Sequence, residues 1–406
     1  MVHAFSLLAK GVWQVDNSAM KHHLFIALTL AIAFLAILTT YFPYVQFSND
    51  IDVFEKIAGS VGTSEYPPLA SSLFYALSLP GFSFETAWLI FLGLMMIGAA
   101  LYAYRFCKTE DASILIIATF VSIYLIGVHY SVARFDIVVM LLIFMSWRAS
   151  LNDRWKDSGF FLILASALKL TPIVLLPLLY ILAPKNAQKR LSYGVFVGIV
   201  VSVLIPIFTL GISQSTENVK YMLKYHSERG VGIDSTWSGI HMLAKNLNGE
   251  KVETALHHVA HHNAELGNSV TFASTIILIL GLLAIYYFAW KKRSEKSAVW
   301  IPLTMMWIVF ASPILSPQFV MWFYPILIII VIDTLRNRQT SIFTLGLIIS
   351  LVLMGVARQW LGPLYYDKLL AQEGLKFTLI LNLRNLMILV GGVLLVFDGN
   401  KRREAF

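Results

Sequence analysis

The run LSYGVFVGIVVSVLIPIFTL, residues 191–210, contains no charged side chain. As a helix it is long enough to cross the hydrocarbon core of a bilayer, which takes about 20 residues. About twelve apolar segments of this kind can be marked along the chain, most of them near that length. They span residues 24–44, 84–104, 114–130, 135–147, 159–168, 171–183, 191–210, 270–290, 298–314, 319–333, 342–357 and 377–397. Because continuous apolar runs lack the alternation of barrel strands, the sequence predicts an all-α integral membrane protein with about twelve transmembrane helices.

The composition agrees with this fold class. Of the 406 residues, 58% are hydrophobic and 13% are charged, and the mean hydropathy is +0.72, well above the range of soluble domains. The single cysteine, Cys107, excludes an intramolecular disulfide. Acidic sequence, not a small-residue cleavage site, follows the first apolar run, so we expect a retained helix and treat residues 1–406 as one domain.

The distribution of charge predicts the orientation. Alternate linkers collect most of the Lys and Arg residues, and the positive-inside rule makes these linkers and both termini cytoplasmic, in a plasma (inner) membrane. The other linkers, which include residues 47–83 and 211–268, face outward and carry most of the acids. We expect short interfacial helices in 47–83 and a helical cap in 211–268, with helices over 239–247 and 251–266. No soluble basic face suited to nucleic acid occurs in the sequence.

The first outer loop, FSNDIDVFEKIAGSVGTSEYPPLASS at residues 47–72, sets Asp50 and Asp52 beside the bilayer. In an extended segment these two side chains would point to one side, whereas on a helix they diverge by about 200°. A solvated acidic loop is the alternative to a functional role. The sequence alone does not decide between them.

Ionisable residues near predicted spans are functional candidates, because burying a charge in the bilayer costs about 2.5–3.5 kcal/mol. Lys169, in SALKLTPIVLLP, lies between two short apolar halves, and Pro172 prevents one continuous helix. Its ammonium either snorkels outward or binds a lipid phosphate. Arg134 and Asp136 mark another outer turn, as an ion pair or a helix start. Gln318 and the belt-type aromatics Trp322 and Tyr324 mark a third outer turn.

The long outer segment contains KYHSERGVGIDSTWSGI, which brings His226, Arg229, Asp234 and Trp237 around two glycines that permit close backbone approach. The following HHVAHH would place His257 and His261 on one face of a helix, as two metal ligands require. The sequence specifies no third ligand. An exposed amphipathic helix is the alternative, and whether a divalent metal takes part stays open.

Four motifs occur in order along this frame: DIDVF with EYPPLA (50–54 and 65–70), ALKLTPIVLLP (167–177), YHSERGVGIDS (225–235) and SPILSPQF (312–319). Together they resemble the GT-C superfamily of glycosyltransferases, and more narrowly family 87, the polyprenol-phosphate-mannose-dependent α-mannosyltransferases. The resemblance implies a GT-C fold, a lipid-linked sugar donor and a glycolipid or glycan acceptor outside the cytoplasm. We expect a monomer, with the bilayer as its surroundings.

The resemblance also implies roles for single residues. Asp50 matches the catalytic base of the first outer loop, with Asp52 as second choice. The residues expected to hold the donor phosphate are Lys169, Arg229 and Arg134, and those expected in the substrate pocket are Tyr66, His226, Asp234, Trp237, Gln318 and Tyr324. Actinobacterial members tend to carry a His pair where this chain has Gln318 and Phe319, which puts a His-assisted step and an actinobacterial acceptor in doubt.

Three alternatives remain open. A polyprenyl-phosphate-arabinofuranose-dependent arabinofuranosyltransferase would share the same frame. A secondary transporter or lipid flippase could translocate its substrate past Lys169, Arg134 and Asp136, although such folds usually carry paired broken helices in two related halves. A non-catalytic assembly subunit is the third, and the gathering of polar residues on one membrane face argues against it.

Overall fold

The structure is a computed structural model that describes residues 49–60, 64–106, 135–257, 261–264, 266, 268–293, 298–315, 317–336, 341–359, 361 and 366–401. The predicted spans at 24–44 and 114–130 lie outside these residues. The other predicted apolar segments all coincide with helices, so the helical fold class is confirmed for the described part of the chain.

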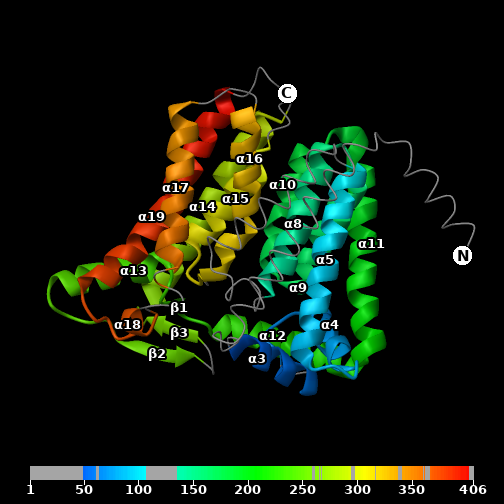
Figure 1. The fold of residues 1–406 in the computed structure, drawn as a ribbon, viewed down its shortest axis with the longest axis horizontal. Coiled ribbons are helices and arrows are strands. Elements are labelled where there is room, and N and C mark those ends of the chain that lie inside the picture. The colour runs from blue at the N-terminus through cyan, green and yellow to red at the C-terminus, as the bar shows by residue number, and fades with distance from the viewer. Residues whose placement is uncertain are drawn as a thin grey trace, which may run out of the picture.

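One group of helices is formed by the first half of the chain (Figure 1). It contains α5 (Phe84–Phe106), α8 (Asp136–Leu151), α9 (Trp155–Leu168), the short η1 (Thr171–Val174) with α10 (Leu175–Leu182), and α11 (Lys185–Leu210). The axes of α9 and α11 approach closely at Gly194, which has no side chain. A Cβ added at Gly194 would collide with the carbonyl of Lys156. Small residues allow such close contact between membrane helices, where no hydrophobic effect drives association.

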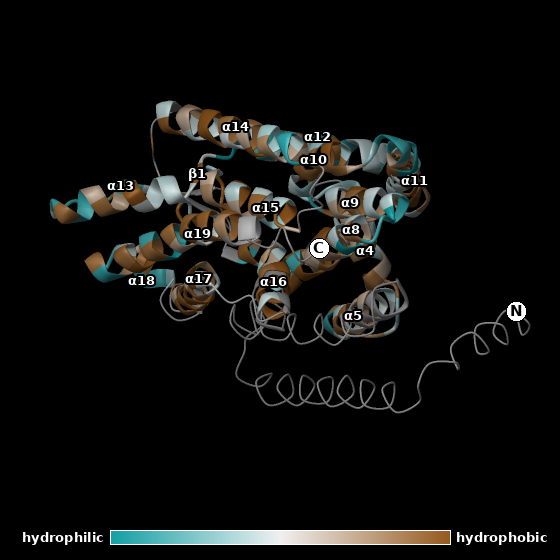
Figure 2. Ribbon diagram, turned by 90° about the horizontal axis from the view of Figure 1, so that it is seen from above, coloured by the Kyte–Doolittle hydropathy of each residue, from teal (hydrophilic) through white to brown (hydrophobic). Residues whose placement is uncertain are grey.

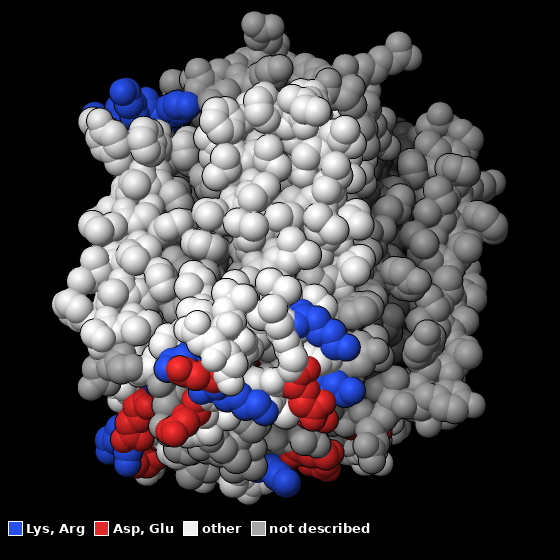
Figure 3. Space-filling view, turned by 90° about the vertical axis from the view of Figure 1, so that its left-hand side faces the viewer, with Lys and Arg blue, Asp and Glu red and all other residues white. Residues whose placement is uncertain are grey.

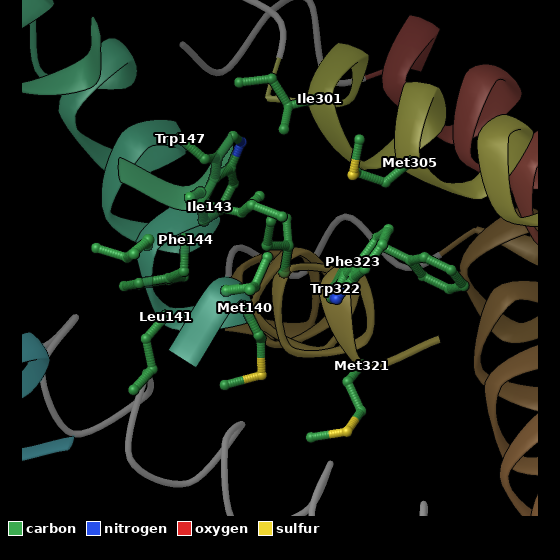
Figure 4. Close-up of a cluster of buried hydrophobic side chains, with 14 of the residues drawn as sticks. Met140, Leu141, Ile143, Phe144, Trp147, Ile301, Met305, Met321, Trp322 and Phe323 are labelled. Atoms are coloured by element: carbon green, nitrogen blue, oxygen red, sulfur yellow. The ribbon is translucent and has the colours of Figure 1, made fainter. Parts of the chain in front are cut away.

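The second half of the chain forms the other group of helices (Figure 1). It contains α14 (Asn268–Lys291), α15 (Trp300–Ala311), η2 (Pro317–Trp322) with α16 (Tyr324–Arg336), α17 (Ile342–Gln359) and α19 (Leu375–Lys401). The two groups meet where α8 packs against η2 and where α10 packs against α14. Figure 4 shows this junction, with Met140, Ile143 and Trp147 of α8 near Trp322, Phe323 and Met305. Nearly every side chain of α8 is buried, which makes it the central helix.

Short helices and a small sheet gather at one end of the bundle (Figure 1). The helices are α3 (Asn49–Gly59), α4 (Pro68–Ser78), α12 (Ile212–Glu228), α13 (Thr236–Leu247) and α18 (Tyr366–Leu370). The strands β1 (Val231–Gly232), β2 (Thr254–His257) and β3 (His261–Ala264) pair antiparallel in the order β1-β3-β2. The two predicted outer segments, 47–83 and 211–268, therefore share one end of the molecule.

The expectation of a helix over residues 251–266 is wrong, because this stretch forms the β2–β3 hairpin. Tertiary contacts override the local helical spacing here. Strand β3 pairs with β1 as well as with β2. The backbone N–H of Val252 donates to the Gln372 side chain at 2.9 Å, and Gln372 donates back to the Val252 carbonyl at 2.6 Å. The expected helix over 239–247 is confirmed as part of α13.

The surface is that of a membrane protein. Three helices of the described residues are long and apolar enough to span a bilayer: Lys185–Leu210, Ser269–Lys291 and Leu375–Phe397. Shorter apolar helices accompany them at Phe84–Met95, Thr171–Leu182, Trp300–Ala311 and Ile342–Ala357. Figure 2 shows the apolar residues spread along these helices, and Figure 3 shows a broad uncharged surface between charged residues at the two ends. The predicted count of twelve spans goes beyond the described part of the chain.

Candidate functional site

The break between α9 and η1 places Lys169 at the end of the bundle that carries the short helices. Helix α9 ends at Leu168, Lys169 is extended with φ −153° and ψ 120°, and Pro172 lies in the first turn of η1. The predicted hairpin with its turn at Lys169 is therefore confirmed. The ammonium of Lys169 lies 2.7 Å from the carboxylate of Asp136, the first residue of α8.

Aromatic rings of η2 complete the surroundings of this ion pair. The indole N–H of Trp322 donates to the same Asp136 oxygen at 2.9 Å. The Lys169 ammonium lies 4.5 Å from the centroid of Phe319 and 5.3 Å from that of Trp322, and these two rings stack on each other. Contact with ring faces stabilises the cation without neutralising it. Lys169 retains 16% side-chain exposure, while Asp136 is 2% exposed.

Gln318 precedes this aromatic pair and is 5% exposed. Its side-chain oxygen has no hydrogen-bond partner within the described part of the chain. Leaving a buried acceptor unsatisfied costs about 1–3 kcal/mol, so such an atom in a folded protein calls for an explanation. A bound substrate hydroxyl or water would satisfy it.

Helix α12 holds residues 64–66 against the site. The side-chain amide of Asn218 donates to the carbonyls of Ser64 and Tyr66, at 2.9 and 3.1 Å. About two turns further along α12, His226 donates its Nε2–H to the carbonyl of Glu65 at 3.2 Å, since a carbonyl can only accept. The ring of Tyr66 packs edge-on against Phe54, Phe74 and Phe135. The EYPP segment is thus fixed from both sides.

Glu65, Tyr225, His226 and Arg229 interact electrostatically at the C-terminal end of α12. Burial, and next the charge of Glu65, raise the pKa of Tyr225 above its ordinary value. Burial, and next the charge of Arg229, lower the pKa of His226, so its imidazole is neutral at pH 7. Burial lowers the pKa of Arg229 as well, but an arginine remains protonated. The Arg229 Nε has no hydrogen-bond partner among the described residues.

The segment after Arg229 lies beside the segment that leads to Gln318. The N–H of Gly232 donates to the carbonyl of Pro313 at 2.9 Å, and a Cβ at Gly232 would lie 3.5 Å from the carbonyl oxygen of Leu315. The charge of Lys169 also reaches His226 and contributes to its lowered pKa. Lys169, His226 and Arg229 therefore belong to one neighbourhood, and two permanent cations with an unsatisfied donor there suit an anionic ligand such as a phosphodiester.

Asp234 and Trp237, both expected in the substrate pocket, anchor the cap to the helical bundle. Arg384, in the middle of α19, contacts the Asp234 carboxylate at 3.4 Å and donates to its carbonyl at 2.5 Å. Arg384 also donates to the side chain of Asn385, and neither charged residue is open to solvent. The indole N–H of Trp237 donates to the carbonyl of Ala311, at the end of α15. Both side chains are thus engaged in structural contacts.

The remaining predicted residues are spread more widely. Asp50 lies in the first turn of α3, and its side chain is outside the described part. Asp52 is exposed on the same helix. Arg134 lies outside the described residues. Tyr324 is fully buried, and its hydroxyl donates to the carbonyl of Leu351, which joins α16 to α17.

The predicted histidine pair has a different backbone from the one expected. His257 ends β2 and His261 begins β3, and their Cα atoms are direct partners across the hairpin. The spacing along one helical face therefore does not apply, and the side chains of both residues lie outside the described part. Among the described residues, no group of three or more His, Cys, Asp and Glu could hold a metal ion.

Three residues of these networks were missed by sequence reasoning: Glu65, Tyr225 and Arg384. Arg384 had a clear signal, because it is a charged residue within the predicted span 377–397. Glu65 and Tyr225 belong to motifs that were noted as EYPPLA and YHSERGVGIDS. The packing of α12 against the segment around Glu65 decides which members of the two motifs face each other. The spacing of residues in the sequence does not predict this packing.

The chain was compared with models of known protein families. The family model for glycosyltransferase family 87 matches residues 65–317, well over half of the chain. The match contains Glu65, Lys169, His226 and Arg229, and it ends next to Gln318. No curated protein matches the chain.

Proposed function

The chain belongs to glycosyltransferase family 87, and from that premise we propose that it transfers a mannosyl residue from polyprenyl-phosphate mannose to a hydroxyl of a glycolipid or glycan. The transfer takes place on the extracytoplasmic face of the plasma (inner) membrane, with both termini in the cytoplasm. The protein acts as a monomer within the bilayer. A GT-C fold with about twelve spans, as predicted from the apolar segments, belongs to this proposal.

The observation that carries the proposal is the gathering of Lys169, His226 and Arg229 at one end of the membrane helices. A polyprenyl phosphate keeps its tail in the hydrocarbon and its phosphate at the boundary, so its binding site must offer cations at that level. Lys169 and Arg229 supply them, one from the break in a membrane hairpin and the other from the end of a surface helix.

The proposed reaction is a single displacement. Asp50, or Asp52 as second choice, accepts the proton of the acceptor hydroxyl, whose oxygen attacks the anomeric carbon of the mannose. The bond between that carbon and the phosphate oxygen breaks, and polyprenyl phosphate leaves with the electron pair. Lys169 and Arg229 stabilise the charge on the departing phosphate. The anomeric configuration inverts, because attack and departure occur on opposite faces of one carbon.

Reconstitution tests the proposal. Purified protein in lipid vesicles is incubated with polyprenyl-phosphate mannose or polyprenyl-phosphate arabinofuranose, together with a panel of glycolipid acceptors. We expect transfer of mannose, reduced about 10²–10⁴-fold in Asp50→Asn and largely retained in Asp52→Asn. If only arabinofuranose is transferred, the donor is polyprenyl-phosphate arabinofuranose and not polyprenyl-phosphate mannose. If the intact lipid-linked sugar crosses the bilayer and no sugar is transferred, the proposal is overturned.

A further inference from the structure

Helix α12 has three distinct faces. Asn218, Met222 and Tyr225 recur at helical spacing and are buried against the protein. Glu217, Lys220, Lys224 and Glu228 form a charged face with two ion pairs, Lys220–Glu217 at 2.7 Å and Lys224–Glu228 at 3.9 Å. The third face consists of Ile212, Val219 and Leu223, which also recur at helical spacing and are exposed by 69%, 37% and 56%.

An apolar face that the protein itself does not cover needs a nonpolar environment. A water-facing helix places its apolar stripe toward the core and its polar residues outside. Helix α12 instead buries the polar Asn218 and exposes three aliphatic side chains at one side of its charged face. Separate apolar and charged faces on a helix outside the core are typical of helices that lie at a membrane surface.

The exposed stripe of α12 continues a surface that faces lipid. Helix α11 is one of the candidate spans, and its last turns expose Leu204 and Phe208, by 43% and 81%. Gly211, with φ +84°, turns the chain between α11 and α12, in a conformation that side-chain-bearing residues rarely adopt. Figure 1 shows α12 lying across the end of the helical group instead of extending α11. Ile212 follows this turn directly, so the apolar surface passes from the spanning helix onto α12.

We propose that α12 docks on the membrane surface, with Ile212, Val219 and Leu223 in the boundary between acyl chains and headgroups and with Lys220 and Lys224 toward the aqueous side. The partner is the lipid surface itself. Burial of this stripe holds the axis of α12 at the level of the headgroups. Arg229, which follows the last residue of the helix, then lies at the level of lipid phosphates. This placement is independent of which sugar the protein transfers.

Site-directed fluorescence tests the docking in the full-length protein. On a Cys107→Ser background, Leu223→Cys and its matched control Lys224→Cys are labelled with an environment-sensitive fluorophore and reconstituted into phosphatidylcholine vesicles. A second pair, Val219→Cys and Lys220→Cys, repeats the comparison in case one variant of the first pair does not fold. Quenching is measured with aqueous iodide and with phosphatidylcholine that carries a nitroxide near the headgroup end of its acyl chain.

We expect blue-shifted emission at 219 and 223, strong quenching by the nitroxide lipid, and an iodide quenching constant several-fold smaller than at 220 and 224. Equal iodide quenching within each pair would overturn the proposal. Blue-shifted emission without lipid quenching would also overturn it, because a second copy of the chain would then cover the stripe. If the wild-type protein transfers no mannose, the proposed function is refuted, but the fluorescence results still test the docking of α12.

Discussion

Two buried ion pairs lie at the same end of the bundle and differ in how completely they are enclosed. The Arg384–Asp234 pair is sealed: Arg384 is fully buried, and Asn385 and the Asp234 carbonyl accept its remaining hydrogen bonds. The Lys169–Asp136 pair is open on one side: Lys169 is 16% exposed and lies against the rings of Phe319 and Trp322. Charge burial in a membrane protein therefore has two uses here.

The sealed pair joins two parts of the chain, the cap segment and the membrane helix α19. A hydrogen bond from the Trp237 indole N–H to the Ala311 carbonyl also fixes the cap segment, at the end of α15. The open pair leaves the Lys169 ammonium partly exposed, within reach of a ligand. An anion can therefore bind to Lys169 without breaking a closed set of hydrogen bonds such as the one around Arg384.

Removing the sealed cation is expected to have the largest effect. Arg384→Met leaves Asp234 buried and unpaired, which should lower the free energy of unfolding by about 3–5 kcal/mol. Thermal unfolding in detergent micelles measures this loss. The double variant Arg384→Met/Asp234→Leu should recover most of the stability, because it removes both charges. A single variant as stable as the wild type would show that the pair does not hold the cap.

Removing the open cation should affect activity more than stability. In Lys169→Met, Asp136 keeps the Trp322 hydrogen bond and its favourable position at the start of α8, so the loss of stability should be smaller than in Arg384→Met. The proposed mannosyl transfer should fall about 10²-fold, since one of the two cations proposed to bind the departing phosphate is lost. Initial rates over a range of donor concentrations measure the effect. Equal losses of stability in the two variants would erase the distinction between the pairs.

Gln318, which directly precedes the Phe319 ring that packs on Lys169, offers a finer test. Gln318→Met removes a buried unsatisfied oxygen at nearly constant volume, so the free energy of unfolding should rise by about 1 kcal/mol. Transfer should fall about tenfold if the amide binds a substrate hydroxyl. Gln318→Glu, which keeps an acceptor at this position, serves as the matched control. A loss of stability in Gln318→Met would assign the amide to the fold instead.

The smallest expected effect concerns His226 and pH. The pKa of His226 is lowered in the folded protein from 6.5, so the unfolded chain binds its proton at a higher pH than the folded chain does. Stability should therefore fall as the pH drops through 6.5 and level off below the folded pKa. His226→Gln should flatten this part of the curve of unfolding temperature against pH. The effect is small because the residue, although crowded by its neighbours, still contacts solvent, which screens its interactions. An unchanged curve would mean that other groups control it.

Apolar length predicts helices well in this chain, because spanning a bilayer leaves few alternatives to a helix. The predicted spans 191–210 and 270–290 coincide with α11 and α14 within a few residues, apart from a polar first turn of α11 at Lys185. The prediction fails over 251–266, where strand pairing with β1 decides the structure and local spacing does not.

The candidate site was predicted in part. Lys169 and Arg229 lie near His226, and their roles toward a donor stay predictions, whereas Asp234 and Trp237 hold the cap in place. The difference depends on side-chain partners that lie far away in the sequence. Asp234 pairs with Arg384, and Trp237 donates to Ala311, so neither role could be inferred from the neighbours of these residues in the chain.

The hydrogen bond from Gly232 to Pro313 joins the two segments beside the site. A substrate that must part the chain after Arg229 from the loop before Gln318 has to break this bond first. The rate at which the Gly232 amide hydrogen exchanges with deuterium therefore reports how often the passage opens spontaneously. If exchange there is slower than turnover, the proposed lipid-linked donor must itself force the two segments apart.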